Sequence, residues 1–203
     1  MMKSIKISAV LLAAGLSKRM GEDKLMLNYC GHSILQQAID LLSELPVYER
    51  ILVTNETRLK SLSLQADIMA LINPKPESGQ SGSVKIGMEV ATGTNFLFIP
   101  ADQPKLRSID IIPLINAAEE YPDKIIFPIV NTKPSSPTIF PERFREELLN
   151  LTGDDGGRNI RNSYPDLCHM IETEYPENFL DIDSVEDYRS LCEVGEESKP
   201  PSL

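Results

Sequence analysis

The sequence predicts an α/β protein: a single domain of three layers, α/β/α, around a mostly parallel, mixed sheet. Three observations support this prediction. Strand and helix patterns alternate through the first half of the chain, which is typical of parallel strands joined by crossover helices. Residues 96–100 are purely apolar, as expected of a central strand covered on both faces. The second half has more strands per helix, which indicates a mixed extension of the sheet.

Apolar periodicity and turn residues define the individual elements. We expect strands at residues 5–12, 50–54, 68–72, 96–100, 124–130, 138–140, 167–172 and 179–182. We expect helices at residues 34–45, 58–64, 108–121, 141–151 and 184–192, and one more that follows the loop at 76–83 and ends near residue 91. Ser33 and Gln36 form a capping-box pattern, as do Ser184 and Asp187, and Pro141 suits the first position of a helix.

Length and composition are those of an ordinary globular domain. The chain has 203 residues, 41% hydrophobic and 25% charged, which is enough to bury one core without disulfides. We expect one domain over residues 1–194 and a disordered polar tail over residues 195–203. No apolar run approaches a membrane span and the first residues lack a signal-peptide layout, so we expect a cytoplasmic protein without a membrane partner.

Charge and cysteine content exclude several classes of function. The net charge of −10 argues against nucleic acid as a partner. Cys30, Cys168 and Cys192 are widely spaced and form no CxxC pair, so neither a disulfide framework nor a thiolate metal site is expected. A polyanionic small ligand would need local cations and a metal ion, which makes basic residues beside a glycine-containing loop informative.

Three polar loops leave the ends of apolar strands, and they start at Leu12, Asn73 and Pro100. Ligands of open α/β sheets bind beyond the carboxyl ends of the strands, so these loops are expected to share one site. In the first loop, Ala13, Ala14 and Gly15 let the backbone approach a ligand, and successive N–H groups can bind an anion.

Two basic residues of this first loop can neutralise phosphates: Arg19 through its planar fork and Lys24 as a point charge. The loop is neither a Walker A sequence nor GxGxxG. The alternative interpretation is a plain strand-to-helix turn with solvated charges.

The pattern Leu-Ala-Ala-Gly-x-Ser-x-Arg-Met-Gly-x-x-Lys, which starts at Leu12, resembles the loop of nucleotidyltransferases with the GT-A-like fold. It is most similar to that of the molybdenum cofactor cytidylyltransferases, and the resemblance extends over residues 5–191. It implies a GT-A-like fold and a nucleoside triphosphate held by Leu12, Ala13, Ala14, Gly15, Arg19 and Lys24. Related guanylyltransferases carry Leu-Ala-Gly-Gly, so Ala14 favours CTP over GTP.

The second loop, residues 73–83, resembles the family's Asn-Pro-x-x-x-x-Gly-x-Ser-x-Ser stretch. The resemblance implies that base and ribose contact this segment, with Asn73, Gly79, Ser81 and Ser83 as the nucleotide-binding residues. Hydroxyl groups near a helix N-terminus also suit an anion. The alternative is that Ser81 or Ser83 only caps the helix.

The third loop offers a candidate metal ligand, Asp102, at the end of the apolar strand over residues 96–100. A carboxylate there can bind Mg²⁺ that bridges phosphates, and the family's Asp-Gln-Pro at this place holds the metal. The alternative is an Asp that starts a turn before Pro104. Asp181 and Asp183 alternate in an expected strand and so face one side; we favour Asp183 as the second metal ligand, with Asp181 close behind.

The acceptor side is less defined. Residues 153–158 resemble the family's Gly-Asp-x-Gly-x-Arg turn, so Arg158 is a candidate to bind the acceptor's phosphate, against a surface ion pair as the alternative. Where family members show Gly-His-Pro, this chain has Ser135-Ser136-Pro137, which weakens the inference about the acceptor more than that about the nucleotide.

Together these features predict a Mg²⁺-dependent nucleotidyltransferase in which Arg19, Lys24 and Asp102 are catalytic. It would transfer CMP from CTP to a phosphorylated acceptor and release pyrophosphate. The resemblance implies molybdopterin as the acceptor and a molybdenum hydroxylase as a client. Two alternatives remain open: a nucleotidyltransferase that uses GTP or acts on a sugar or polyol phosphate, and a non-catalytic molybdenum cofactor carrier or accessory protein.

Overall fold

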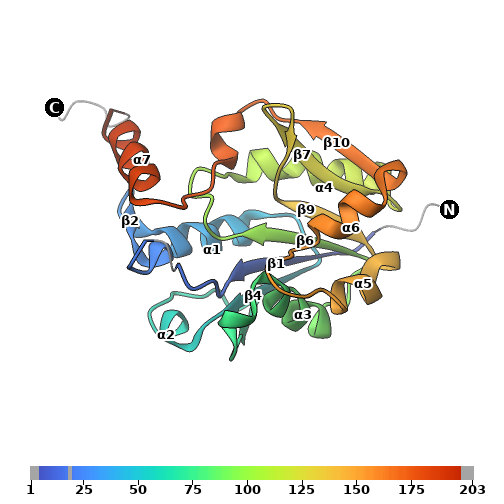
Figure 1. Ribbon diagram of the computed structural model, residues 1–203, viewed down its shortest axis with the longest axis horizontal. Coiled ribbons are helices and arrows are strands. Elements are labelled where there is room, and N and C mark those ends of the chain that lie inside the picture. The colour runs from blue at the N-terminus through green and yellow to red at the C-terminus, as the bar shows by residue number, and fades with distance from the viewer. Residues whose placement is uncertain (1–4, 18–19, 198–203) are drawn as a thin grey trace.

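The computed structural model describes residues 5–17 and 20–197, which form an α/β fold around one mixed sheet (Figure 1). The sheet has eight strands in the order β10-β7-β9-β6-β1-β4-β5, and β8 pairs with β7. Strands β5, β4, β1 and β6 run parallel, whereas β9 is antiparallel to both β6 and β7. The predicted fold class is therefore confirmed, and the extension of the sheet in the second half begins with the reversed strand β9.

The strands of the main sheet are β1 (Ile7–Ala13), β4 (Glu49–Thr54), β5 (Ile68–Ile72), β6 (Asn95–Pro100), β7 (Ile125–Val130), β8 (Lys133–Pro134), β9 (Thr138–Pro141) and β10 (Cys168–Glu172). A separate short hairpin pairs β2 (Asn28–Tyr29) with β3 (His32–Ser33). The central strand β1 is fully paired, since residues 8–13 pair with β4 and residues 7–12 with β6.

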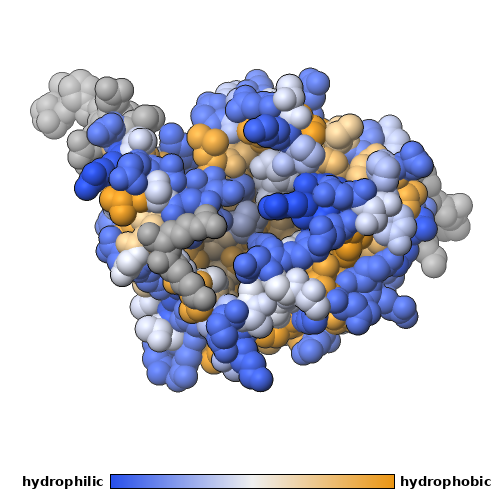
Figure 2. All heavy atoms as spheres, in the orientation of Figure 1, coloured by the Kyte–Doolittle hydropathy of each residue, from blue (hydrophilic) through white to orange (hydrophobic). Residues whose placement is uncertain are grey.

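The helices are α1 (Ile34–Glu44), α2 (Glu56–Leu59), α3 (Gln80–Val90), α4 (Ser108–Glu120), α5 (Arg145–Leu149), α6 (Arg158–Ser163) and α7 (Val185–Glu197). Short 3₁₀ turns lie at η1 (Lys24–Met26), η2 (Pro76–Ser78), η3 (Glu142–Phe144), η4 (Pro165–Leu167) and η5 (Pro176–Phe179). None of the helices in the described residues is long and apolar enough to cross a membrane. Hydrophilic residues cover most of the face shown in Figure 2, and hydrophobic ones form separate patches.

Two apolar clusters fill the space on the two faces of the sheet. Along β1, Ala9 and Leu11 belong to one cluster and Val10 to the other, as the alternation of a strand requires. The first cluster contains the apolar residues of α1 and α4, and the second contains those of α3 and α5. This arrangement buries β1 on both faces and leaves its carboxyl end free to carry a site.

Several boundaries differ from the predictions. The strand expected over residues 179–182 is absent: Phe179 ends η5, and residues 180–183 belong to no helix or strand. Pro141 ends β9 instead of starting a helix, because its backbone still pairs with Asn95 of β6. Helix α2 begins at Glu56, where the Asn55 side chain accepts a hydrogen bond from Arg58 N–H and caps it. Helix α7 runs to Glu197, beyond the boundary expected at residue 194.

The helix caps expected at two serines are present. The Ser33 hydroxyl accepts from the Gln36 N–H at 3.1 Å and begins α1. The Ser184 hydroxyl accepts from the Asp187 N–H at 3.1 Å, while the Asp187 carboxylate accepts from the Ser184 N–H at 2.8 Å. The hydrogen bond from Ser184 is the main cause that lowers the pKa of Asp187. The second pair is a complete capping box, and it fixes the chain immediately after Asp183.

Candidate active site

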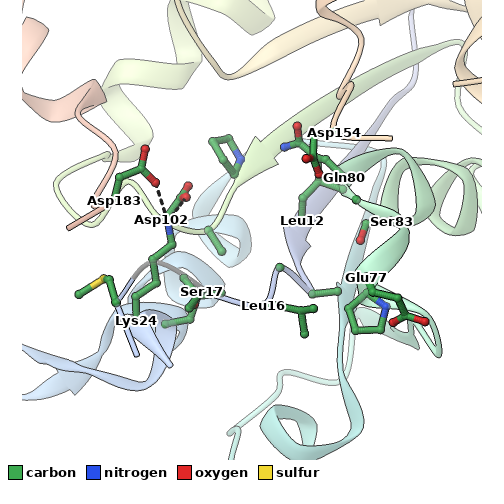
Figure 3. A pocket seen from close by; sticks show the side chains of 18 residues that line it. Leu12, Leu16, Ser17, Lys24, Glu77, Gln80, Ser83, Asp102, Asp154 and Asp183 are labelled. Carbon is green, nitrogen blue, oxygen red and sulfur yellow. Dashed lines mark hydrogen bonds and ion pairs between the residues drawn. The ribbon is translucent and has the colours of Figure 1, made fainter. Parts of the chain in front are cut away.

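A cavity of about 390 Å³ opens at the carboxyl ends of β1 and β6, a size within the range of small-molecule sites (Figure 3). Residues of all three predicted loops line it. The predicted residues in its wall are Leu12, Ala14, Gly15, Lys24, Gly79, Ser83, Asp102 and Asp183. Arg19 lies outside the described residues, so its predicted contact with phosphate stays a prediction.

One side of the cavity is an ionic cluster centred on Lys24 (Figure 3). Its ammonium group donates to Asp102 Oδ2 at 2.7 Å, to the carbonyl of Ile182 at 2.7 Å and to Asp183 Oδ1 at 3.1 Å. Burial by itself would lower the pKa of Lys24, but the two carboxylates outweigh it and raise the pKa. The lysine is therefore firmly cationic, and it holds together residues that are 78 and 159 positions away in the sequence.

Asp181 and Asp183 point to different places, contrary to the prediction that they share one side of a strand. Asp183 reaches Lys24, whereas Asp181 Oδ1 accepts from the Gln103 amide at 2.9 Å. Between them Ile182 is buried, and its N–H donates to the carbonyl of Asp102 at 2.9 Å. Because residues 180–183 form no strand, the alternation rule did not apply, and only Asp183 faces the Lys24 cluster.

The pKa of the Asp181 carboxyl is raised to about 6. The largest cause is the loss of hydration among the surrounding protein atoms, although the side chain still reaches solvent. The negative charge of Asp102 raises the pKa further. The hydrogen bond from Gln103 acts in the opposite direction. The carboxylates of Asp102 and Asp183 thus lie close enough to that of Asp181 to raise its pKa, so this end of the sheet favours added positive charge.

The residue set fits a divalent metal that is shared with a ligand. Among the residues described, no group of three or more His, Cys, Asp or Glu side chains is placed to hold a metal by itself. The carboxylate oxygens of Asp102 and Asp183 both accept from the Lys24 ammonium group, so a cation is already the favoured occupant between them. Mg²⁺ prefers such an arrangement, since it is held by one or two carboxylates and completed by phosphates and water.

The opposite side of the cavity is formed by η2 and the start of α3, with Glu77, Gln80, Ser83 and Asp154 around it (Figure 3). Helix α3 begins at Gln80 with Gly79 as its cap residue, so neither Ser81 nor Ser83 caps it. Gly79 has φ +86°, and a Cβ there would lie 2.4 Å from the carbonyl oxygen of Gly153. Glycine is thus required where residues 153–154 pack against the loop of residues 73–83.

Three residues that were predicted to contact the nucleotide are buried behind the cavity wall and do not line the cavity. The Asn73 amide donates to Ser83 Oγ at 3.1 Å and its oxygen accepts from the Lys75 N–H at 2.9 Å. Ser81 donates its N–H to the carbonyl of Gly153 at 3.1 Å. The carbonyl of Ala13 accepts from the Thr54 hydroxyl at 3.2 Å. These hydrogen bonds hold the cavity wall in place, and the three residues do not themselves line the cavity.

Sequence reasoning missed two residues beside the first loop. Ser17 lines the cavity in a left-handed conformation (φ 49°), and its buried hydroxyl lacks a hydrogen-bond partner within the described part of the chain. Arg58 is 2% exposed and lies behind the loop, paired with Asp23 at 2.6 Å. Ser17 stands in the motif itself and could have been included, whereas Arg58 gave no sequence signal beyond its place in a predicted helix.

A second, more polar recess of about 160 Å³ shares Leu12, Gln80, Pro100 and Asp154 with the first cavity. Arg158, Arg161, Ser135, Ser136 and Asp181 also line it. Arg158 is the first residue of α6, a helix that the sequence did not predict. Arg161 was also missed: its guanidinium lies 4.7 Å from the ring centroid of Phe127, and burial followed by the charge of Arg158 lowers its pKa.

Comparison with characterised proteins places the chain among nucleotidyltransferases. It is 27% identical over 190 residues to the molybdenum cofactor cytidylyltransferase of Escherichia coli K12, covering 90% of this chain and 93% of that protein. It is 32% identical over 123 residues to a probable molybdenum cofactor guanylyltransferase of Rhodopirellula baltica. That second match covers 58% of each chain, so this chain spans little more than half of the guanylyltransferase.

Solved structures share the whole fold. Rv0371c from Mycobacterium tuberculosis H37Rv superposes with a TM-score of 0.79 at 20% identity, covering 94% of this chain and 100% of that one. A complex of the same mycobacterial protein with manganese gives a TM-score of 0.74 at 20% identity over 93% of this chain and 98% of that one. The family model for the MobA-like NTP transferase domain matches residues 9–167, so the chain belongs to the MobA-like NTP transferase family.

Proposed function

We propose that the protein transfers CMP from CTP to a phosphorylated acceptor, with molybdopterin as the acceptor, and releases pyrophosphate. The observation that carries this proposal is the convergence of Lys24, Asp102 and Asp183 at the mouth of the glycine-containing loop. A lysine that holds two carboxylates together beside a loop of small residues suits a metal-bound triphosphate. Membership of the family supports the transfer of a nucleotidyl group, and the choice of base and acceptor is our inference.

The triphosphate is assigned to the end of the cavity between the first loop and the Lys24 cluster. Ala14 carries only a methyl group and Gly15 no side chain, so both leave room for a phosphate, and the Ser17 hydroxyl has no hydrogen-bond partner among the described residues and can donate to it. Asp102 and Asp183 would hold the divalent ion. When bound, this ion would neutralise phosphate charge and polarise the reacting phosphate. The manganese complex of the mycobacterial neighbour is consistent with a divalent ion in this fold.

The base is assigned to the wall formed by η2 and α3. Glu77, Gln80 and Asp154 line this wall and offer hydrogen-bond acceptors. Cytosine presents an exocyclic amine to such acceptors, whereas uracil has a carbonyl oxygen at the same position. Ala14 and the near full-length match to a cytidylyltransferase both favour CTP over GTP.

The reaction follows from this placement. An oxygen of the acceptor's phosphate attacks the α-phosphorus of CTP, and the bond from that phosphorus to the bridging oxygen of the β-phosphate breaks. The electron pair leaves with pyrophosphate, and the attacking phosphate is already ionised at neutral pH. The chain therefore needs no nucleophile of its own. Its residues position the two phosphates and neutralise the developing charge, and Lys24 stabilises the departing pyrophosphate.

The acceptor is assigned to the recess that contains Arg158 and Arg161. This recess adjoins the nucleotide cavity through Gln80 and Asp154, so an anionic group held there would lie next to the nucleotide. The Arg161 Nε–H is buried and lacks a hydrogen-bond partner in the described residues, so it is free to bind an oxygen of the acceptor. Two arginines are better suited to bind a phosphate group than to bind a neutral sugar.

Thermal-shift binding of CTP, GTP, ATP and UTP with Mg²⁺ tests the donor. A ligand that binds only the folded protein raises the apparent stability by mass action, so CTP is expected to give the largest shift. Equal shifts for all four nucleotides would refute the choice of base. Release of pyrophosphate on addition of molybdenum-loaded molybdopterin tests the acceptor, and binding without turnover would favour the carrier alternative.

A further inference from the structure

We infer that Arg58 is a positioning residue for nucleotide binding: its buried guanidinium orients the backbone of the first loop toward the triphosphate. The inference rests on the proposed function, because it assigns the triphosphate to that loop. Arg58 does not touch the proposed ligand site itself. It is on α2 and is absent from the cavity lining, and it acts through residues that line the cavity, such as Gly15.

Arg58 makes four hydrogen bonds through its guanidinium group, which has five N–H donors. Its Nε and Nη2 atoms donate to the two carboxylate oxygens of Asp23 at 2.7 and 2.6 Å. Its Nη1 atom donates to the carbonyl of Ala13 at 2.5 Å, and Nη2 also donates to the carbonyl of Gly15 at 2.7 Å. A side chain that is 2% exposed thus binds two carbonyls of the short segment that ends β1.

These two carbonyls determine where the loop's N–H groups point. In a planar trans peptide, the carbonyl of one residue and the N–H of the next point in opposite directions. Because Arg58 draws the carbonyls of Ala13 and Gly15 toward α2, the N–H groups of Ala14 and Leu16 point away from α2. Ala14, Gly15 and Leu16 all line the cavity. Without Arg58, the carbonyl of Ala13 would keep its hydrogen bond from Thr54, whereas the carbonyl of Gly15 would be able to turn toward the triphosphate and repel it.

Asp23 extends the same network to Lys24. While it pairs with Arg58, its Oδ1 atom also accepts from the Leu25 N–H at 3.2 Å and caps the turn η1, whose first residue is Lys24. The Arg58–Asp23 pair therefore connects the two parts of the chain that we assign to the phosphates: the end of β1 and the turn that carries Lys24. The charge of Arg58 is balanced by Asp23, so its role is orientation rather than attraction of the anion.

The chain offers a matched control in Arg50. Its side chain also donates to two backbone carbonyls, Leu42 at 3.0 Å and Leu45 at 2.6 Å, and pairs with Asp67 at 2.9 Å. Arg50 lies at the amino end of β4, whereas the cavity lies at the carboxyl end of the neighbouring parallel strand β1. Arg50→Lys and Arg58→Lys both replace the fork by a point charge, which cannot satisfy the same set of acceptors. Any purely structural effect should therefore appear in both variants.

The test measures dissociation constants of the full chain for two probes, CTP with Mg²⁺ and pyrophosphate with Mg²⁺, beside the melting temperature. For Arg58→Lys we expect both constants to rise about tenfold or more and by the same factor, because the loop acts on phosphates. For Arg50→Lys we expect a similar loss of thermal stability and both constants within about twofold of the parent. Gln80→Ala, in the wall assigned to the base, should raise the dissociation constant of CTP and leave that of pyrophosphate unchanged.

The outcomes separate this inference from the proposed function. If the parent protein binds neither probe, the proposed function fails, and with it the reason for the inference. If the parent binds and Arg58→Lys binds both probes as tightly as Arg50→Lys does, Arg58 is only structural and the inference is overturned. Should Arg58→Lys fail to fold, Asp23→Asn provides the test, since its amide oxygen can still cap η1 while one acceptor of Arg58 is lost; unchanged binding there would also overturn the inference.

Discussion

Replacing Lys24 by methionine removes a cation that contacts both proposed metal ligands. The side chain is 14% exposed, and its ammonium group makes three hydrogen bonds, two of them at 2.7 Å. Exposed ion pairs contribute about 0–1 kcal/mol, whereas breaking a fully buried pair costs about 3–5 kcal/mol. The partial exposure of Asp102 and Asp183 places Lys24→Met between these limits, at about 2 kcal/mol. For a domain of this size, that corresponds to a melting temperature lower by about 4–8 °C.

The assay follows melting temperature with EDTA or with Mg²⁺, both without nucleotide. In the parent, a metal ion must displace the Lys24 ammonium from Asp102 and Asp183, so Mg²⁺ alone should stabilise it little. In Lys24→Met the ammonium group no longer competes with the metal for these carboxylates, so Mg²⁺ should recover part of the lost stability. Release of pyrophosphate should nevertheless fall by about 100-fold or more, because the cation at the leaving group is gone.

The control variant is Lys60→Met. Lys60 pairs with Glu56 at 2.8 Å, but the two side chains are 73% and 68% exposed. Its melting temperature and its response to Mg²⁺ should match those of the parent. The reasoning is refuted if Lys24→Met melts like the parent, if Mg²⁺ stabilises parent and variant equally, or if the variant keeps near-parental turnover.

Three further changes test separate parts of the site. Ser17→Ala removes a buried hydroxyl without a partner in the described chain, so it should leave the melting temperature unchanged or higher while CTP binds more weakly in a titration. Gly79→Ala should destabilise the protein by clearly more than Gly31→Ala, which has a similar positive φ but open space around it; equal melting temperatures would contradict the packing argument. Arg158→Ala should leave the dissociation constant of CTP within about twofold and slow transfer to the acceptor, measured as pyrophosphate release.

The central sheet was predictable because its strands carry local signals. Residues 96–100 are purely apolar, and in the structure β6 lies between β1 and β9 with its first five residues buried. The ends of such strands meet at one edge, so the three loops could be placed together before the structure was known. The short elements α6, β8 and η5 were not predicted, since they form on contact with the sheet rather than from a periodic pattern of their own.

The side-chain contacts within the site were less predictable. Asp181 and Asp183 were expected to face one side, but their segment forms no strand and Ile182 turns inward between them. Arg58 is separated from Asp23 by 35 positions, and its role depends on two carbonyl groups that a sequence does not reveal. Which polar groups contact each other depends on how the chain packs in three dimensions. The sequence could therefore assign loops to the site more reliably than it could pair individual side chains within it.

The contacts of Lys24 explain how an acidic chain can hold a binding site for a polyanion. With a net charge of −10, an isolated cation would do little to attract a triphosphate, and three carboxylates close to the cavity oppose it. Asp102 and Asp183 would hold a divalent ion in place of the ammonium group, and Lys24 would then be able to bind the phosphates. Binding of metal and binding of nucleotide should then strengthen each other by the same factor, as thermodynamic linkage requires. We therefore expect the site to bind a metal–nucleotide complex more tightly than the nucleotide alone.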